Sequence, residues 1–225
     1  MEIGEIKSVF EDHSNPSEAI KMKKYMRGQF EYLGIKSPIR AELKALILTN
    51  AEFKNLSAEA LIPLIYKLWK EDCREYQYIA MELLDRKIKT ANPEIVEHLE
   101  YLIVSKPWWD TIDFIATHLV GTLFLKFPEL IKKYVPRWMK SENIWLQRTV
   151  LLFQLKYRKN LDEGILFDSI IKLNKSKEFF IQKAIGWALR EYGKSNPESV
   201  VEFVRKTELA PLSKREALRR IVKMQ

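Results

Sequence analysis

The residues best placed to do chemistry are a tryptophan and an aspartate one helical turn apart, Trp109 and Asp113. Both lie on the flank of an apolar stripe, where a side chain can be held by packing and still face outward. A carboxylate there could stabilise a positive charge, and the face of a large ring also attracts cations. The alternative is structural: Trp109 covers the edge of the core, and Asp113 is a solvated acid that the helix dipole favours.

The apolar stripe defines the helix that carries this pair. We expect the helix to begin near Pro107, because proline suits the first turn, where its missing N–H would have no partner. Buried positions then recur three and four residues apart. They are Ile112, Ile115, Ala116, Leu119, Val120 and Leu123, and Trp108 falls within the same stripe and is expected in the core.

Helices are expected along the whole chain. Polar residues that cap helices stand before apolar stretches at Asn15, Ser57, Asn143 and Asp162, and one predicted helix covers residues 19–32. No credible alternating strand lies between the helices, and seven glycines leave little material for the turns of a sheet. The sequence therefore predicts an all-α fold.

The helices also repeat. An aromatic or apolar residue, then a polar residue, then an apolar helix recurs around Gln77, Thr111, Gln147 and Gln182, at steps of 34, 36 and 35 residues. Helix pairs with this period are typical of an α-solenoid of HEAT-like repeats, whose inner helices line a concave surface. We therefore predict a single domain over residues 1–225.

Two further repeats are expected to present side chains to that concave surface. In the helix around residue 148, two apolar faces leave a strip between them that should open on the groove. This strip carries Trp145, Arg148, Leu152 and Lys156. In the helix around residue 187, Trp187 lies off the core stripe, on the side of Phe180, Lys183 and Glu191. Three repeats thus offer the groove a Trp with an Asp, an Arg with a Lys, and a second Trp.

The charge distribution points to a polyanionic partner. The net charge is +8, and residues 1–104 carry 15 Lys and Arg against 17 Asp and Glu, whereas residues 105–225 carry 23 against 13. A basic half of this kind favours binding of a polyanion, although it is also compatible with a well-solvated surface. Aromatic rings interleaved with Lys and Arg in a basic groove are suited to nucleic acid.

Other chemistries find no support in the sequence. There is no glycine-rich nucleotide loop and no G-x-S-x-G motif, so we expect no cofactor and no serine nucleophile. The three histidines, His13, His98 and His118, and the single Cys73 stand apart, which predicts no metal site and no internal disulfide. The chain has neither a signal peptide nor a membrane span by composition, so we expect a soluble, cytoplasmic protein.

The carboxylate is the unusual member of a phosphate-binding groove, because it repels the ligand. It is expected to persist only if it stabilises something positive. An alkylated DNA base carries such a charge, and cleavage of its glycosidic bond moves the charge to the sugar as an oxocarbenium ion. Asp113 could stabilise that cation and orient the attacking water, with ring-face attraction from Trp109 and Trp187.

At these residues the sequence resembles the AlkD-type alkylpurine DNA glycosylases, a family of HEAT-like repeat proteins, over nearly its whole length. The stretches that carry the resemblance are residues 106–113 (KPWWDTID), 143–148 (NIWLQR), 153–157 (FQLKY), 177–187 (KEFFIQKAIGW) and 209–217 (LAPLSKREA). The resemblance implies a monofunctional hydrolase of base excision repair. Its implied substrates are cationic lesions such as N3-methyladenine and N7-methylguanine in double-stranded DNA, and the base is left stacked rather than flipped.

The resemblance also implies roles for individual residues. Trp109, Asp113 and Trp187 would be the catalytic residues of the cleft, and Tyr25, Arg148 and Lys156 would lie beside the DNA backbone. Lys156 and Lys183 are candidates for the lysine nucleophile of a bifunctional glycosylase, but we expect both to bind phosphate. The protein is expected to be a monomer. The rival hypothesis is a non-catalytic HEAT-like scaffold that binds nucleic acid or protein through its basic groove.

Overall fold

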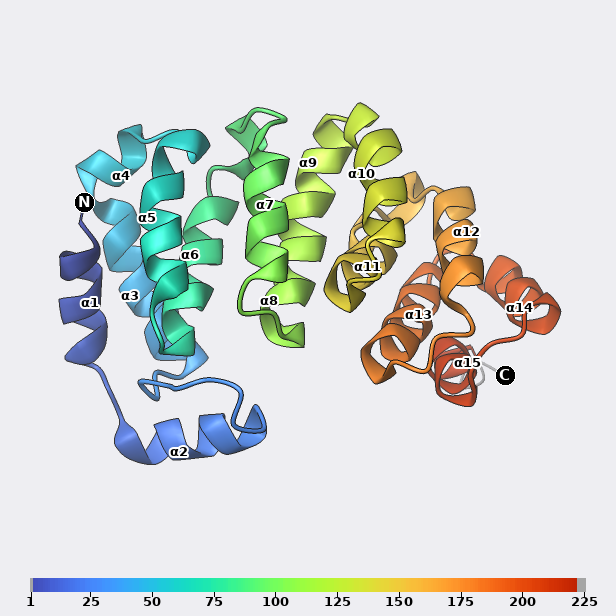
Figure 1. Ribbon diagram of the computed structural model, residues 1–225, viewed down its shortest axis with the longest axis horizontal. Coiled ribbons are helices and arrows are strands. Elements are labelled where there is room, and N and C mark those ends of the chain that lie inside the picture. Colours follow the sequence, from blue (N-terminus) through green and yellow to red (C-terminus); the bar gives the residue numbers. More distant parts are fainter. Residues whose placement is uncertain (1, 222–225) are drawn as a thin grey trace. The chain divides into compact units, whose positions relative to one another are not determined.

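Helices, with one isolated bridge between Glu31 and Cys73, make up the regular secondary structure of residues 2–221, the part of the chain that the computed structural model describes (Figure 1). The predicted all-α fold is confirmed. Contacts divide the chain into unit 1, up to His98, and unit 2, from Leu99 onward, with the division inside α7 (Ile95–Val104). The single domain over the whole chain stays a prediction.

Unit 1 contains four helices that pack on one another, α1, α3, α5 and α6, while α2 lies at the lower edge of the unit in Figure 1. Side chains cap three of its helix starts: Asn15 and Ser57, as the sequence predicts, and Asn50, which was not predicted. The elements are α1 (Ile3–Glu11), α2 (Pro16–Tyr25), α3 (Ser37–Thr49), α4 (Ala51–Asn55), α5 (Ala58–Lys70), α6 (Arg74–Asp85) and the short 3₁₀ helix η1 (Ile88–Thr90).

The helix α2 ends at Tyr25 rather than near residue 32, because Arg27 and Gly28 both take positive φ angles, 57° and 72°. The loop that follows is held by the buried carboxylate of Glu75. Its oxygens accept the backbone N–H groups of residues 33, 34 and 35 at 3.0, 2.9 and 3.1 Å. At Gly34 a Cβ would lie 2.0 Å from the carbonyl oxygen of Asn15, so only glycine fits. These contacts fix the end of the helix that carries Tyr25.

Unit 2 is built around α11, which packs against α10, α12 and α13 and against the segment α8–η2, and α13 in turn packs on α14 and α15 (Figure 1). The elements are α8 (Trp109–Phe114), the π-helical turn η2 (Ile115–Val120), α9 (Gly121–Lys126), α10 (Glu129–Lys140), α11 (Ile144–Leu152), the 3₁₀ helix η3 (Arg158–Asn160), α12 (Glu163–Leu173), α13 (Phe179–Tyr192), α14 (Pro197–Lys206) and α15 (Pro211–Leu218). Many of the contacting helices are consecutive in the chain, among them α5–α6, α10–α11 and α14–α15, so the fold class is the predicted α-solenoid of helical repeats. The concave basic groove stays a prediction.

The repeated glutamines have a shared structural role. The Nε2 atom of Gln77 donates to carbonyl oxygens at the end of α5, among them that of Glu71 at 2.7 Å. Gln147 and Gln182 donate in the same way to the carbonyl oxygens of Met139 and Ser176, at 3.3 and 3.0 Å. Each amide therefore satisfies carbonyl groups that the preceding helix or its end leaves without an internal partner. The three glutamines thus tie α6, α11 and α13 to the segment before each of them, whereas Thr111, at the remaining repeat position, donates to the carbonyl oxygen of Trp108 at 3.3 Å.

Candidate active site

The helix that carries Trp109 and Asp113 begins two residues after Pro107. Trp108 is its extended N-cap residue, and α8 starts at Trp109. All six residues of the predicted apolar stripe are fully buried, as expected. Trp108 is only partly buried, so its assignment to the core is corrected: its ring packs against the rings of Trp145 and Phe180, with centroids 5.9 and 5.1 Å apart.

The sequence predicts one regular helix, whereas the structure inserts the π-helical turn η2 directly after α8. The hydroxyl of Thr117 donates to the carbonyl oxygen of Asp113 at 2.8 Å, which competes with the regular backbone pattern at that point. After the turn, Gly121 lets the chain approach Phe153, whose carbonyl oxygen would lie 2.4 Å from a Cβ. Turns of this kind are frequent at functional sites.

A cavity of about 280 Å³ brings together five of the seven site residues that the sequence analysis names. Trp109 and Asp113 come from α8, Arg148 from α11, and Lys183 and Trp187 from α13. The remaining lining residues are Phe179, Phe180, Arg190 and Glu216. Two tryptophans from different helices therefore share one cavity with a carboxylate, and each of these groups can stabilise a cation.

The carboxylate of Asp113 is held by Arg148 in a two-pronged ion pair. Its Oδ1 accepts from Nε at 2.7 Å and its Oδ2 from Nη2 at 2.9 Å, and Nη1 of the same arginine donates to the carbonyl oxygen of Phe180 at 2.5 Å. The Asp113 side chain is 18% exposed and that of Arg148 is 5% exposed. Planar pairing at both oxygens fixes the orientation of the carboxylate. Burial raises the pKa of Asp113 above its ordinary value, and Arg148 counteracts only part of that effect.

The strip on α11 that was expected to open on a groove is largely covered. Trp145 and Arg148 are buried and Leu152 is fully buried; only Lys156, beyond the end of the helix, is exposed. The ring of Phe180 at the start of α13 lies 5.0 Å from that of Trp145. Because α8 and α13 flank α11, this strip faces neighbouring helices, and Arg148 is turned toward Asp113. A contact between Arg148 and DNA stays a prediction.

Glu216 of α15 and Arg190 of α13 line the cavity and were not named as site residues. Glu216 pairs with Lys183 at 3.2 Å and with Arg190 at 2.5 Å. Burial opposes ionisation of Glu216, but the two ion pairs outweigh it and hold its pKa below the ordinary value. Lys183 therefore lies at the cavity with its charge already partnered by an acid from the next helix.

A glycine directly before Trp187 is the sequence signal for this close approach of α15. A Cβ at Gly186 would lie 2.5 Å from Cβ of Glu216 and 3.0 Å from the carbonyl oxygen of Ser213. Gly186→Ala should therefore push α15 outward and lower the free energy of unfolding by about 1–3 kcal/mol. Urea unfolding measures the loss. Gly4→Ala is the control, because nothing lies within 4 Å of a Cβ there; equal losses for both variants would contradict the close packing.

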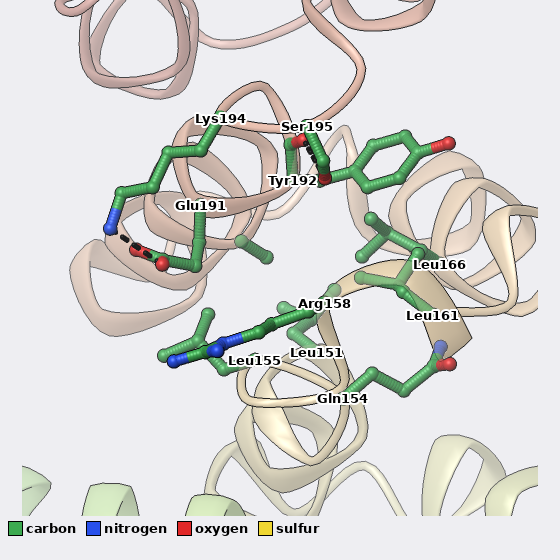
Figure 2. Close-up of a pocket in the computed structure, with 11 residues that line it drawn as sticks. Leu151, Gln154, Leu155, Arg158, Leu161, Leu166, Glu191, Tyr192, Lys194 and Ser195 are labelled. Atoms are coloured by element: carbon green, nitrogen blue, oxygen red, sulfur yellow. Dashed lines mark hydrogen bonds and ion pairs between the residues drawn. The ribbon is translucent and has the colours of Figure 1, made fainter.

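Tyr25, Lys156 and Glu191 do not line this cavity. Tyr25 is 74% exposed at the end of α2 in unit 1. Lys156 is exposed and contacts His118. Glu191, expected on the side of Trp187, pairs with Lys194 at 2.6 Å and lines a second, leucine-rich cavity of about 330 Å³ (Figure 2). Glu191 therefore follows Trp187 by one turn of α13 but does not share its cavity.

No group of three or more His, Cys, Asp or Glu side chains among residues 2–221 could hold a metal ion. Within the same range, no helix has the length and apolar character needed to cross a bilayer.

Comparison with known proteins gives a consistent result. Residues 6–221 match the family described as DNA alkylation repair enzyme. Among solved structures, the fold is similar to a protein described as a predicted DNA alkylation repair enzyme from Enterococcus faecalis, with 33% sequence identity and a TM-score of 0.86. That match covers 93% of this chain and 97% of the other. No curated protein matches the chain.

Proposed function

The chain belongs to the DNA alkylation repair enzyme family, and from that premise we propose that it is a monofunctional DNA glycosylase. It hydrolyses the N-glycosidic bond of cationic alkylated purines, N3-methyladenine and N7-methylguanine, in double-stranded DNA. The observation that carries the proposal is the single cavity that Trp109, Asp113 and Trp187 line, with the carboxylate oriented by Arg148. The damaged base stays stacked in the duplex, and the enzyme acts as a cytoplasmic monomer in base excision repair.

The chemistry needs few protein groups, because the substrate already carries a good leaving group. The bond between the sugar and the cationic base breaks, its electron pair neutralises the base, and the positive charge passes to the sugar ring. Asp113 stabilises that oxocarbenium ion and orients the water that adds to it, while a proton leaves the water. The ring faces of Trp109 and Trp187 add about 0.5–2 kcal/mol each. A tenfold rate gain needs about 1.4 kcal/mol, so a few such contributions suffice.

Cationic and aromatic side chains away from the reacting atoms bind the double-stranded DNA. Tyr25, Lys156 and Lys183 bind the backbone, and Lys183 exchanges part of its pairing with Glu216 for a phosphate. Arg148 stands beside the backbone as well, but its main effect comes through the orientation and charge of Asp113. No metal or cofactor takes part.

The proposal is tested with a duplex that contains a single N7-methylguanine. The protein should release the free base well above the spontaneous rate and leave an abasic site with an intact strand. Treatment with borohydride should trap no covalent adduct, because water rather than Lys156 or Lys183 attacks the sugar. DNA binding without release would favour the non-catalytic scaffold, and a trapped adduct would show a lysine nucleophile.

A further inference from the structure

Beyond the Asp113–Arg148 pair, the same two segments of unit 2 meet at a second contact. Nζ of Lys156, just after α11, lies within hydrogen-bonding distance of Nε2 of His118 in η2. Lys156 lies eight residues, roughly two helical turns, beyond Arg148, and His118 lies five residues beyond Asp113. The π-helical turn, with its wider spacing per turn, brings His118 round to this position. Both side chains are accessible to solvent.

The imidazole of His118 is held by more than this contact. The ring of Phe114, one turn earlier, stacks on it with centroids 4.2 Å apart and planes 4° from parallel. An ammonium group keeps its proton to a higher pH than an imidazole does. Two cations in contact would repel each other, so the contact fits a charged Lys156 as donor and a neutral His118 as acceptor at Nε2.

The charged groups on the elements that pack against η2 are few. They are Asp110 and Asp113 of α8, Lys126 of α9, and Arg148 of α11, with Lys156 directly after it. Asp113 and Arg148 are committed to each other. An anion that approaches His118 and Lys156 therefore meets two groups that together can present two positive charges, but only if His118 takes up a proton.

We propose that His118 and Lys156 form a proton-linked phosphate clamp. This inference rests on the DNA-binding activity proposed above. A backbone phosphate replaces the direct contact between the two side chains and accepts a hydrogen bond from Nζ of Lys156 and another from Nε2 of His118. The second bond requires a proton on Nε2, so binding of the duplex takes up one proton from solvent, and Phe114 keeps the imidazole in place.

The sign of the pH effect follows from linkage. Because the bound state holds one more proton than the free state, affinity rises as pH falls. Over the pH range in which His118 is neutral in the free protein and charged in the complex, the dissociation constant should increase by up to about tenfold for each unit by which the pH is raised. A lysine alone would give no such dependence in this range.

The test measures binding of an undamaged duplex by fluorescence anisotropy between about pH 6 and about pH 8 at constant ionic strength. Undamaged DNA avoids acid-catalysed loss of an alkylated base. His118→Gln should remove the pH dependence, because glutamine can contact both partners without changing charge. His13→Gln is the matched control, since His13 is an exposed histidine of unit 1, and it should keep the pH dependence.

A variant of Lys156 and a measurement of proton uptake test the clamp independently of His118→Gln anisotropy. Lys156→Gln removes one of the two groups that bind the phosphate, so binding should weaken at every pH. It also removes the positive charge that opposes protonation of His118, so the pH dependence of binding should move to higher pH. Calorimetry in two buffers of different ionisation enthalpy should give an uptake approaching one proton for the wild-type protein and about zero for His118→Gln.

Two outcomes separate this inference from the proposed function. Duplex binding that is independent of pH, or a dependence that survives in His118→Gln, would overturn the clamp and leave the glycosylase intact. Failure of the wild-type protein to bind a duplex at any pH would overturn both. Thermal unfolding of each variant confirms that the folded protein is being measured.

Discussion

Replacement of Asp113 by asparagine should lower the rate of base release by a factor on the order of a hundred, which corresponds to about 2.7 kcal/mol of lost transition-state stabilisation. The amide has nearly the same shape but no charge to offer an oxocarbenium ion. Its Nδ2 group would also face the guanidinium of Arg148, a second donor in place of an acceptor. The loss should appear in the single-turnover rate, because the missing interaction is one made in the transition state.

Two controls define what this loss means. Asp110→Asn removes a carboxylate from the same helix that does not line the cavity, and its rate should stay near that of the wild-type protein. Binding of an undamaged duplex by Asp113→Asn should be unchanged or tighter, because a negative charge has been removed beside the phosphates. Full excision activity in Asp113→Asn would overturn the assigned mechanism but not the proposed reaction.

The pattern of apolar residues was sufficient to predict the helix that carries Asp113. Burial along a helix repeats with a fixed period, so Ile112, Ile115 and Leu119 could be assigned to the core from spacing alone, and all three are fully buried. The same period places Trp109 and Asp113 side by side on the flank, and both line the cavity. Local geometry therefore predicts which side chains share a face.

Periodicity could not predict which partner covers that face. Arg148 lies 35 residues from Asp113 in the sequence, and it also donates to the carbonyl oxygen of Phe180, which comes from a third helix. A strip that carries Arg and Lys between two apolar faces is predicted to be exposed to solvent, because buried charges are uncommon without a partner. The ion pair that partners the buried Arg148 is a tertiary contact with α8, so it could not be predicted from the sequence pattern of α11.

The same limit applies to Glu216. Its element, α15, reaches the cavity only because Gly186 allows two helices to approach closely, and a single glycine within a helix has several explanations. The π-helical turn is hidden for a related reason. Thr117 can form its bond to the carbonyl oxygen of Asp113 or point outward, and the local sequence favours neither.

Arg148 gives the second large prediction, because it acts on the charge state of Asp113. Its hydrogen bonds and its positive charge both lower the pKa of Asp113, against the raising effect of burial. Arg148→Met removes both contributions, so the pKa of Asp113 should rise further and the carboxyl should bind a proton at higher pH. At neutral pH the rate of base release should fall by roughly tenfold to a hundredfold, because the protonated acid cannot stabilise a cation.

The pH profile distinguishes this role from a merely structural one. A group that must be ionised loses activity as pH falls through its pKa, so the acid limb of the rate profile should move to higher pH in Arg148→Met. The defect should shrink as pH is raised from about 6 to about 8.5. Arg148→Lys, which keeps the charge but cannot pair with both oxygens, should show a smaller shift. The rates are measured above the spontaneous loss of the base at each pH.

The double variant tests whether Arg148 acts through Asp113. If Arg148 acts through Asp113, then Asp113→Asn and Arg148→Met together should cost little more than Asp113→Asn alone, because the second change has no carboxylate left to affect. A loss of equal size at every pH, additive with Asp113→Asn and accompanied by weaker binding of undamaged duplex, would show instead that Arg148 binds the DNA backbone directly. The guanidinium, buried and paired at both carboxylate oxygens, favours the first outcome.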